Sequence, residues 1–375
     1  MGNTTVTTTA TEVVLPGKVE VDGLQLRTRV LPAPAAGQVV LSMDATGVSF
    51  AEQQMRRGKY YNQPPFPFVP GYDVVGTVVT IGPDVDPALI GRRFAAVTKT
   101  GAWASALVLD AADLVAVPDS VSAAAAETVA VNGVTAWQML HRSTKVRAGG
   151  TIVVLGANGG VGSTLVQLAR HAGIKVIGTA SPRHHAALRE LGVTPVDYHA
   201  PDLYGQIREL APEGVDAVFD HVGGAGVVQS WRLLRRGGTL VSYGTAATKD
   251  TDGNSQAPVL KLFARLALWN HLPNGKSARF YNFWAGKRRL DAFRARLRED
   301  LTQVLRLVAE GALHPQIAAE FPLSDAGSAL ALAESRTVAG KVVIVADTPA
   351  VNPAAGQLQV CSGSAAVAER SRACP

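Results

Sequence analysis

The stretch between residues 151 and 244 alternates short apolar runs with helix-like segments, and no other feature of the sequence constrains the fold as strongly. TIVVLG (151–156) has the length and β-branched content of a strand, and GGVGSTLVQLARHAG after it has a helical period. Further strand-like runs follow at KVIGTAS, PVDY, VDAVFD and TLVSYG, with helical segments between them. Strands that alternate with helices of this length predict an α/β fold with a parallel, doubly wound sheet.

A glycine-rich turn joins the first of these strands to its helix, with Gly156, Gly159 and Gly162 at the bend. A backbone without side chains lets a pyrophosphate approach closely, and the N–H groups that begin the helix stabilise its negative charge. The alternative is a tight turn that binds nothing, but a strand, glycines, a helix and a second strand in this order indicate a dinucleotide site. The candidate cofactor-binding residues of the turn are Gly156, Asn158, Gly159, Gly160, Val161 and Gly162.

The end of the second strand distinguishes between the two nicotinamide cofactors. An acidic residue there would accept hydrogen bonds from the ribose 2′-hydroxyl of NADH, but GTASPRHH contains none. Ser181, Arg183 and His185 instead offer a hydroxyl and positive charge to a 2′-phosphate, so the sequence predicts NADPH. A solvated helix start is the alternative, although cations are unfavourable at a helix N-terminus unless an anion binds nearby.

The segments on either side of this α/β unit have a different texture. Before it, short β-branched runs are bounded by Gly and Pro, and after it come an amphipathic helix and the strand GKVVIV. We therefore expect a cofactor-binding domain inserted in a β-rich domain. The expected divisions are 1–132 and 289–349 for the β-rich domain, 133–288 for the inserted domain and 350–375 for a flexible tail. Residues 245–278 lack a clear period and are a candidate lid, and ARFYNFW after them is a candidate final strand.

Composition and charge exclude several classes of protein. The chain has 375 residues and a formal net charge of +6, which suits anionic ligands but is too weak to indicate nucleic-acid binding without a basic tract. No apolar run is long enough to span a bilayer and the N-terminus lacks the features of a secretory signal, so we expect a cytoplasmic location. The only cysteines, Cys361 and Cys374, lie in the tail and provide neither a disulfide framework nor a cysteine cluster for a metal.

Several motifs, in their order and spacing, resemble those of zinc-independent medium-chain dehydrogenases/reductases of the quinone oxidoreductase type. The matching stretches are GVSFAEQQMRRGKY (47–60), VPGYDVVG (69–76), GVTAW (133–137), GANGGVG with VQLA (156–169), VFDHVGG (218–224) and ESRTVAGKVVIV (334–345). The resemblance implies a Rossmann domain inserted in a GroES-like catalytic domain, with the active site between them. It also implies that hydride from NADPH reduces a quinone or an activated C=C bond.

The resemblance also assigns residues to the cofactor. The family's contacts to the 2′-phosphate fall on Ser181, Tyr198 and Arg336, and a threonine near the nicotinamide riboside falls on Thr135. Open α/β sheets bind ligands at the carboxyl ends of their strands. The candidate residues there are His221, Val222, Tyr243 and Gly244. A structural role is the alternative for His221.

Zinc is not expected in this chain. Zinc-dependent relatives carry a cysteine in the segment that matches GVSFAE and a histidine in the segment that matches PGYD, and these positions hold Ser49 and Tyr72 here. A hydroxyl and a phenol cannot replace a thiolate and an imidazole as zinc ligands. Without a Lewis acid to polarise an alkoxide, simple alcohol dehydrogenation is disfavoured.

The substrate side is carried by the segment GVSFAEQQMRRGKY. Tyr60 matches a tyrosine of related enoyl-thioester reductases and is the candidate proton donor, with a packing role as the alternative and Tyr61 beside it leaving the register open. Ser49, Gln54 and Arg56 fall on family positions near the substrate, although quinone reductases have Asn and Tyr in place of the first two. A capping hydroxyl is the alternative for Ser49.

The favoured hypothesis is an NADPH-dependent reductase that acts on a small electrophile, a quinone or an α,β-unsaturated carbonyl. The alternatives are an enoyl-thioester reductase of fatty-acid or polyketide assembly and, outside enzymes, an NADPH-binding protein with little or no catalysis. The basic residues of 279–298 would suit an acidic carrier protein or coenzyme A phosphates, but a solvated helix face explains them more simply. By analogy with relatives we expect a homodimer, with ARFYNFW as a candidate pairing edge.

Overall fold

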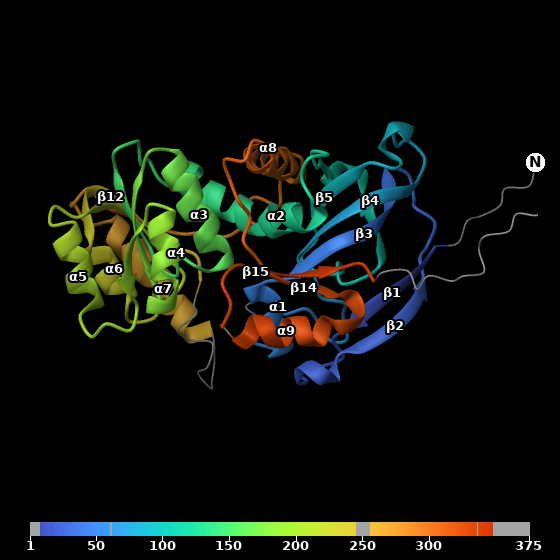
Figure 1. Cartoon of the computed structure of the whole chain (residues 1–375), viewed down its shortest axis with the longest axis horizontal. Helices are drawn as coiled ribbons and strands as arrows, with labels where there is room; N and C mark the ends of the chain where they lie inside the picture. Colours follow the sequence, from blue (N-terminus) through green and yellow to red (C-terminus); the bar gives the residue numbers. More distant parts are fainter. Residues whose placement is uncertain (1–7, 61, 245–255, 336, 348–375) are drawn as a thin grey trace, which may run out of the picture.

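The computed structural model describes residues 8–60, 62–244, 256–335 and 337–347, which form two sheets joined by helices (Figure 1). The first sheet has seven strands and is built from both ends of the chain, so that β15 pairs antiparallel with β3 across nearly three hundred residues of sequence. Its strands are β3 (Gln38–Val48), β4 (Asp73–Ile81), β5 (Arg93–Val97), β6 (Ala106–Asp110), β7 (Val115–Ala116), β14 (Ile317–Pro322) and β15 (Lys341–Val345). A separate antiparallel pair, β1 (Thr9–Val14) and β2 (Gln25–Val30), lies beside it.

The second sheet has six parallel strands in the order β10-β9-β8-β11-β12-β13. This is the order of a doubly wound dinucleotide-binding sheet, in which the strand order reverses between β8 and β11 while all strands stay parallel. Its strands are β8 (Thr151–Val154), β9 (Lys175–Ala180), β10 (Thr194–Asp197), β11 (Val215–Asp220), β12 (Leu234–Ser242) and β13 (Ser277–Phe280). The predicted fold class is confirmed, and the last strand overlaps only the first three residues of ARFYNFW, the candidate final strand.

Helices cover the parallel sheet on both faces, and one of them corrects the sequence analysis. They are α3 (Gly160–His171), α4 (His185–Glu190), α5 (Leu203–Leu210), α6 (Val227–Arg232) and α7 (Gln256–Asn270). Residues 256–270 of the candidate lid at 245–278 therefore form a packed helix where no regular element was expected, and residues 245–255 lie outside the described residues. The apolar spacing of Leu262, Leu266 and Trp269 buries one side of α7 against the sheet, where Trp269 stacks on Trp231 with ring centroids 4.8 Å apart.

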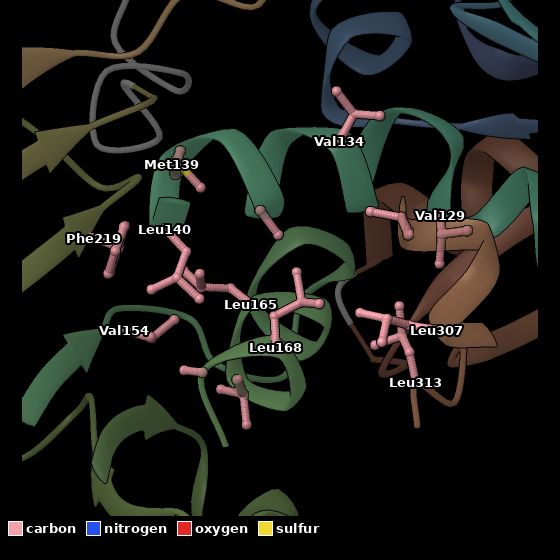
Figure 2. Packing of buried hydrophobic residues seen from close by; sticks show 14 of the residues in the cluster. Val129, Val134, Met139, Leu140, Val154, Leu165, Leu168, Phe219, Leu307 and Leu313 are labelled. Carbon is pink, nitrogen blue, oxygen red and sulfur yellow. The ribbon is translucent and has the colours of Figure 1, made fainter. Parts of the chain in front are cut away.

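Two helices lie between the sheets and connect them. α2 (Ala123–Trp137) packs against α3 of the cofactor side, against β3 and β4 of the seven-stranded sheet, and against α8 (Leu290–Ala309). Figure 2 shows this shared apolar core, to which α2, the helical turn after it, α3 and α8 contribute Val129, Met139, Leu140, Leu165, Leu168 and Leu307, and the strands β8 and β11 contribute Val154 and Phe219. Because α2 is buried on nearly all sides, residues along it face both halves of the molecule.

The seven-stranded sheet holds charged groups in its interior. The Lys341 ammonium donates to Asp73 at 2.9 Å and lies 2.5 Å from Glu127, and all three side chains are buried. Asp73 also accepts from the Val131 N–H of α2 at 3.1 Å. Burial, and then the charge of Asp73, hold the pKa of Glu127 well above its usual range. The Lys341–Asp73 ion pair and the Asp73–Val131 hydrogen bond thus fasten α2 to the sheet, because removing either charged partner would leave the other buried and uncompensated.

Two short helices complete the β-rich half. α1 (Phe50–Arg56) and α9 (Ala326–Ser335) lie together below the sheet in Figure 1. Among the described residues, no helix is long and apolar enough to cross a membrane.

Candidate active site

The glycine turn has the geometry that close approach of a ligand requires. Gly156 has φ +71°, and a Cβ there would lie 2.5 Å from Cε1 of His221, while a Cβ on Gly162 would overlap the carbonyl oxygen of Gly156. Packing within the protein therefore requires glycine at positions 156 and 162, whether or not a ligand binds. Gly159 differs, because a Cβ there would meet nothing nearer than 3.5 Å. The protein itself would accommodate a side chain at residue 159, so the glycine there leaves the start of α3 open to a ligand.

The start of α3 provides unpaired backbone donors at this turn. Gly159 is the N-cap of α3 and offers no side-chain cap, so the N–H groups of Gly160, Val161 and Gly162 belong to a first turn without intrahelical acceptors. Asn158 precedes the cap, and its carbonyl accepts from the Gly340 N–H at 3.3 Å. Such a helix start, with α3 continuing for 12 residues behind it, fits a pyrophosphate.

The predicted 2′-phosphate ligands gather just beyond β9. Ser181 is half-buried directly after the strand, and its hydroxyl makes no cap hydrogen bond. Arg183 is exposed and its Nε donates to His184 at 3.0 Å, whereas His185 turns back onto the Ala180 carbonyl at 3.1 Å. Tyr198 follows β10 and is 50% exposed. Arg336 lies outside the described residues.

The ends of β11 and β12 form the opposite wall of the turn. Asp220 is buried and its carboxylate accepts from the N–H groups of Val222 and Gly223, both at 2.8 Å. His221 contacts the Leu155 carbonyl at 3.0 Å through Nδ1, and burial lowers its pKa, so a neutral ring is favoured beside Gly156. Tyr243 packs near it, with ring centroids 5.9 Å apart.

Close contact also explains the glycine after Tyr243. A Cβ on Gly244 would lie 2.7 Å from the His221 carbonyl oxygen. Whether His221, Val222, Tyr243 and Gly244 contact a cofactor stays a prediction, and the structure shows that the first of them also has the structural role given as its alternative.

Buried polar groups on α2 face this wall. The Asn132 amide lies where a Cβ on Gly160 would come within 2.5 Å of it, so it borders the glycine turn. Thr135, one turn further on, is also buried. Tyr281, after β13, donates to Gln138 at 3.0 Å; burial raises its pKa, and a hydrogen bond with Thr135 opposes that shift. Thr135, the predicted riboside residue, therefore lies near the polar side chains of Tyr281 and Gln138.

An aromatic cluster packs against α2 at Val131, next to these polar residues. The Tyr60 and Tyr72 hydroxyls are 3.1 Å apart, and the indole N–H of Trp284 donates to the Tyr72 hydroxyl. Tyr72 and Trp284 pack with ring centroids 5.7 Å apart, and Val131 of α2 belongs to the same apolar group. Tyr60 is half-buried, so it forms the outer member of a chain of hydrogen-bonding aromatics, which we call the aromatic relay.

The other substrate-side candidates have structural partners. Ser49 caps α1: its hydroxyl accepts from the Ala51 N–H at 3.1 Å while Glu52 accepts from the Ser49 N–H at 2.9 Å. The capping alternative therefore describes Ser49. Arg56 makes a bidentate pair with Glu334 of α9 at 2.9 and 2.7 Å. Arg56 therefore links α1 to α9, and a substrate contact by Arg56 would compete with its pair to Glu334.

Gln54 lies on the same helix as these residues. Its side chain is buried, and its carbonyl accepts from the Lys59 N–H at 2.9 Å, which holds the loop that carries Tyr60. A direct substrate contact by Ser49, Gln54 or Arg56 stays a prediction.

The sequence analysis missed the part played by residues 281–284. Tyr281 and Trp284 were grouped within a strand, although the strand ends at Phe280 and the aromatics after it reach the relay. Three aromatics in the four positions YNFW, directly after the carboxyl end of a strand, were the available signal. In the neighbouring basic run, Arg294 pairs with Asp110 and Asp113, each at 2.7 Å.

The positions that bind zinc in zinc-dependent relatives are committed to other contacts. The Ser49 hydroxyl caps α1 and the Tyr72 hydroxyl belongs to the aromatic relay. In the described ranges no group of three His, Cys, Asp or Glu side chains is placed to hold a metal. These residues do not fit a catalytic zinc ion.

Two family models match the chain. The alcohol dehydrogenase GroES-like domain covers residues 35–119, and a domain described as zinc-binding dehydrogenase covers residues 191–344. The second match lies outside the segments that hold Ser49 and Tyr72, so its description does not bear on the missing ligands.

Known proteins give the same assignment along most of the chain. The synaptic vesicle membrane protein VAT-1 homologue of Rattus norvegicus is 31% identical over 332 residues, which is 86% of this chain and 80% of the relative. A quinone oxidoreductase structure from Pseudomonas syringae superposes with a TM-score of 0.77 at 26% identity, covering 90% of this chain and 99% of that one. A mycobacterial protein solved in complex with NADPH gives 0.74 at 26% identity, with the same coverage. The chain belongs to the medium-chain dehydrogenase/reductase oxidoreductases of the quinone oxidoreductase type.

Proposed function

We propose that the protein is an NADPH-dependent reductase that transfers hydride to a quinone or an α,β-unsaturated carbonyl. The observation that carries the proposal is the placement of α2, which sets Asn132 against the glycine turn and, one residue earlier, Val131 against the aromatic relay. A dinucleotide turn and a source of protons thus meet across one helix. The quinone oxidoreductase and NADPH-bound structures described above support the same activity.

The proposed cofactor site divides between backbone and side chains. The N–H groups of residues 160–162 would bind the pyrophosphate, and Ser181 with Arg183 would bind the 2′-phosphate in a strand end that offers no acid to a 2′-hydroxyl. NADPH, when bound, supplies the hydride. Thr135 and Asn132, buried beside the turn, would orient the nicotinamide end.

The aromatic relay would supply the proton that the reduced acceptor needs. The Trp284 N–H can only donate, so the Tyr72 oxygen accepts from it and the Tyr72 O–H remains available to donate to Tyr60. Tyr60 can then donate its own proton to an enolate or quinol oxygen and be reprotonated from Tyr72 or from water. The indole N–H lowers the cost of negative charge on the Tyr72 oxygen, as a hydrogen bond to the charged form does.

Two alternatives from the sequence analysis remain as distinct outcomes. An enoyl-thioester reductase is supported by the mycocerosic acid synthase-like polyketide synthase of Mycobacterium tuberculosis, which is 28% identical over 88% of this chain and 15% of that protein. A cofactor-binding protein with little catalysis is the other alternative. The cytoplasmic location and the homodimer stay predictions.

The test measures turnover of a panel of acceptors from the loss of NADPH absorbance. We expect turnover with p-benzoquinone or with a simple enone, and weaker turnover when NADH replaces NADPH. Reduction of only crotonyl thioesters would overturn the acceptor class in favour of the enoyl-thioester alternative. NADPH binding without oxidation of the cofactor by any acceptor would favour the binding protein.

A further inference from the structure

Lys99 occupies a backbone conformation that a lysine rarely adopts. Its φ is +74° in the loop between β5 and β6, in the left-handed region that costs a non-glycine residue free energy. The loop is fixed against the relay, because the N–H groups of Thr98 and Lys99 both donate to the Tyr72 carbonyl, at 2.9 and 3.1 Å. Glycine follows only two positions later, so the loop holds a lysine where glycine would relieve the strain.

A second lysine reaches the same place from the other half of the molecule. The Lys287 ammonium lies 4.4 Å from the ring centroid of Trp284, whose N–H donates to the Tyr72 hydroxyl. Lys287 is exposed, and its backbone N–H donates to the Trp284 carbonyl at 3.2 Å, so the turn after the relay presents it there. The indole face therefore positions this cation beside the aromatic relay.

Both lysines belong to segments that contact the Tyr72–Trp284 pair, Lys99 through the Tyr72 carbonyl and Lys287 through the Trp284 ring. Burial, and then the positive charge of Lys287, lower the pKa of Lys99, in keeping with that placement. Across the described residues, neither lysine makes an ion pair, whereas Arg294 nearby on the chain pairs with two aspartates. Two positive charges presented near the same residues, with no carboxylate paired to either, favour an anion between them.

We propose that Lys99 and Lys287 form an anion clamp that selects acceptors carrying a carboxylate or phosphate group beyond the reactive carbonyl. This inference rests on the proposed function and names the substrate class for it. The relay receives the carbonyl, while the clamp, drawn from both halves of the molecule, binds the anionic end. Such charge-assisted contacts discriminate between charged and neutral acceptors, because a neutral one leaves the two cations unpaired.

The test compares matched acceptors in the full-length protein. Acetylacrylate and its methyl ester differ in one carboxylate, and crotonyl-coenzyme A and crotonyl-pantetheine differ in the phosphates and in the adenosine that carries them, for which crotonyl-phosphopantetheine controls. The variants are Lys99→Asn, which removes the charge with a residue that tolerates positive φ, and Lys287→Gln. Lys175→Gln, on an exposed residue at the amino end of β9, is the control. The quantity measured is the ratio of kcat/KM for the anionic acceptor to that for the neutral one.

We expect the wild-type ratio to exceed one in at least one pair, and each clamp variant to lower it about tenfold, as for loss of a charge-assisted contact. A drop confined to the coenzyme A pair would assign the clamp to phosphates, and a drop confined to acetylacrylate to carboxylates. A ratio that no variant changes would overturn the clamp while turnover of neutral acceptors upheld the proposed function. If no acceptor turns over, calorimetric titration with coenzyme A decides: equal affinity of the wild type and both variants would overturn the clamp.

Discussion

The two halves of the candidate site are built by different means. At the proposed cofactor half, backbone geometry would do the binding: a left-handed glycine, a close approach at Gly162 and the open start of α3. At the proposed substrate half, side chains would do it through the Tyr60–Tyr72–Trp284 relay, and the buried charges around Lys341 hold its frame. A site built from backbone groups can keep its ligand when neighbouring side chains are substituted, whereas a site built from side chains can change its specificity when one of them is replaced. A family can therefore keep one cofactor and vary its acceptors.

The largest expected effect concerns the frame of the substrate half. Lys341→Met leaves Asp73 and Glu127 buried without their cation, and we expect a loss of about 3–5 kcal/mol of stability, as for breaking a buried pair. Denaturant unfolding measures it, with Lys175→Met as the exposed control. A loss below about 1 kcal/mol, the ordinary value for a surface pair, would mean that these charges do not hold the frame.

A second change separates chemistry from binding at the relay. Tyr60→Phe keeps the ring and removes the outer hydroxyl, so we expect kcat to fall roughly 10- to 100-fold with little change in the Kd for NADPH, the usual scale for general-acid groups. Steady-state kinetics and a cofactor titration give both numbers. An unchanged kcat across the pH range would assign Tyr60 to packing, the alternative given from the sequence.

A third change tests whether side chains contribute at the cofactor half. Arg183→Ala should weaken NADPH binding about tenfold and leave NADH unchanged, because only the 2′-phosphate would lose a charged contact. Arg189→Ala, on an exposed arginine of α4, is the matched control. Equal weakening of both cofactors would place Arg183 away from the 2′-phosphate.

The smallest effect is a dependence of stability on pH. Burial and Asp73 raise the pKa of Glu127, so the folded state retains a proton that the unfolded chain releases above its ordinary carboxyl pKa. Stability from this group is present at low pH and is lost as pH rises toward the folded pKa. Glu127→Gln has no such proton to lose, so its stability relative to the wild type should rise as the pH increases above the ordinary carboxyl pKa. A difference that stays flat with pH would contradict the raised pKa.

The contrast between the halves also explains what could be predicted from the sequence. The parallel sheet and the glycine turn follow from local patterns, because strand, turn and helix are adjacent in the chain. The relay joins Tyr60 and Tyr72 to Trp284, more than two hundred residues later, so no local pattern connects them. Ser49 had two open roles, and only the Glu52 geometry showed the cap. The helix at 256–270 escaped prediction because it follows a stretch rich in Gly, Asp and Thr.

The most direct test of the account is a titration of NADPH against Gly159→Ala. A Cβ at residue 159 meets no protein atom within 3.4 Å, so the variant should fold and lose no more than about 1 kcal/mol of stability at this N-cap. The added methyl would nevertheless occupy the approach to the start of α3, and we expect the Kd for NADPH to rise at least about tenfold, or about 1.4 kcal/mol. Gly17→Ala, whose Cβ meets nothing within 4 Å, is the control. An unchanged Kd in a folded Gly159→Ala protein would contradict a dinucleotide bound at this turn.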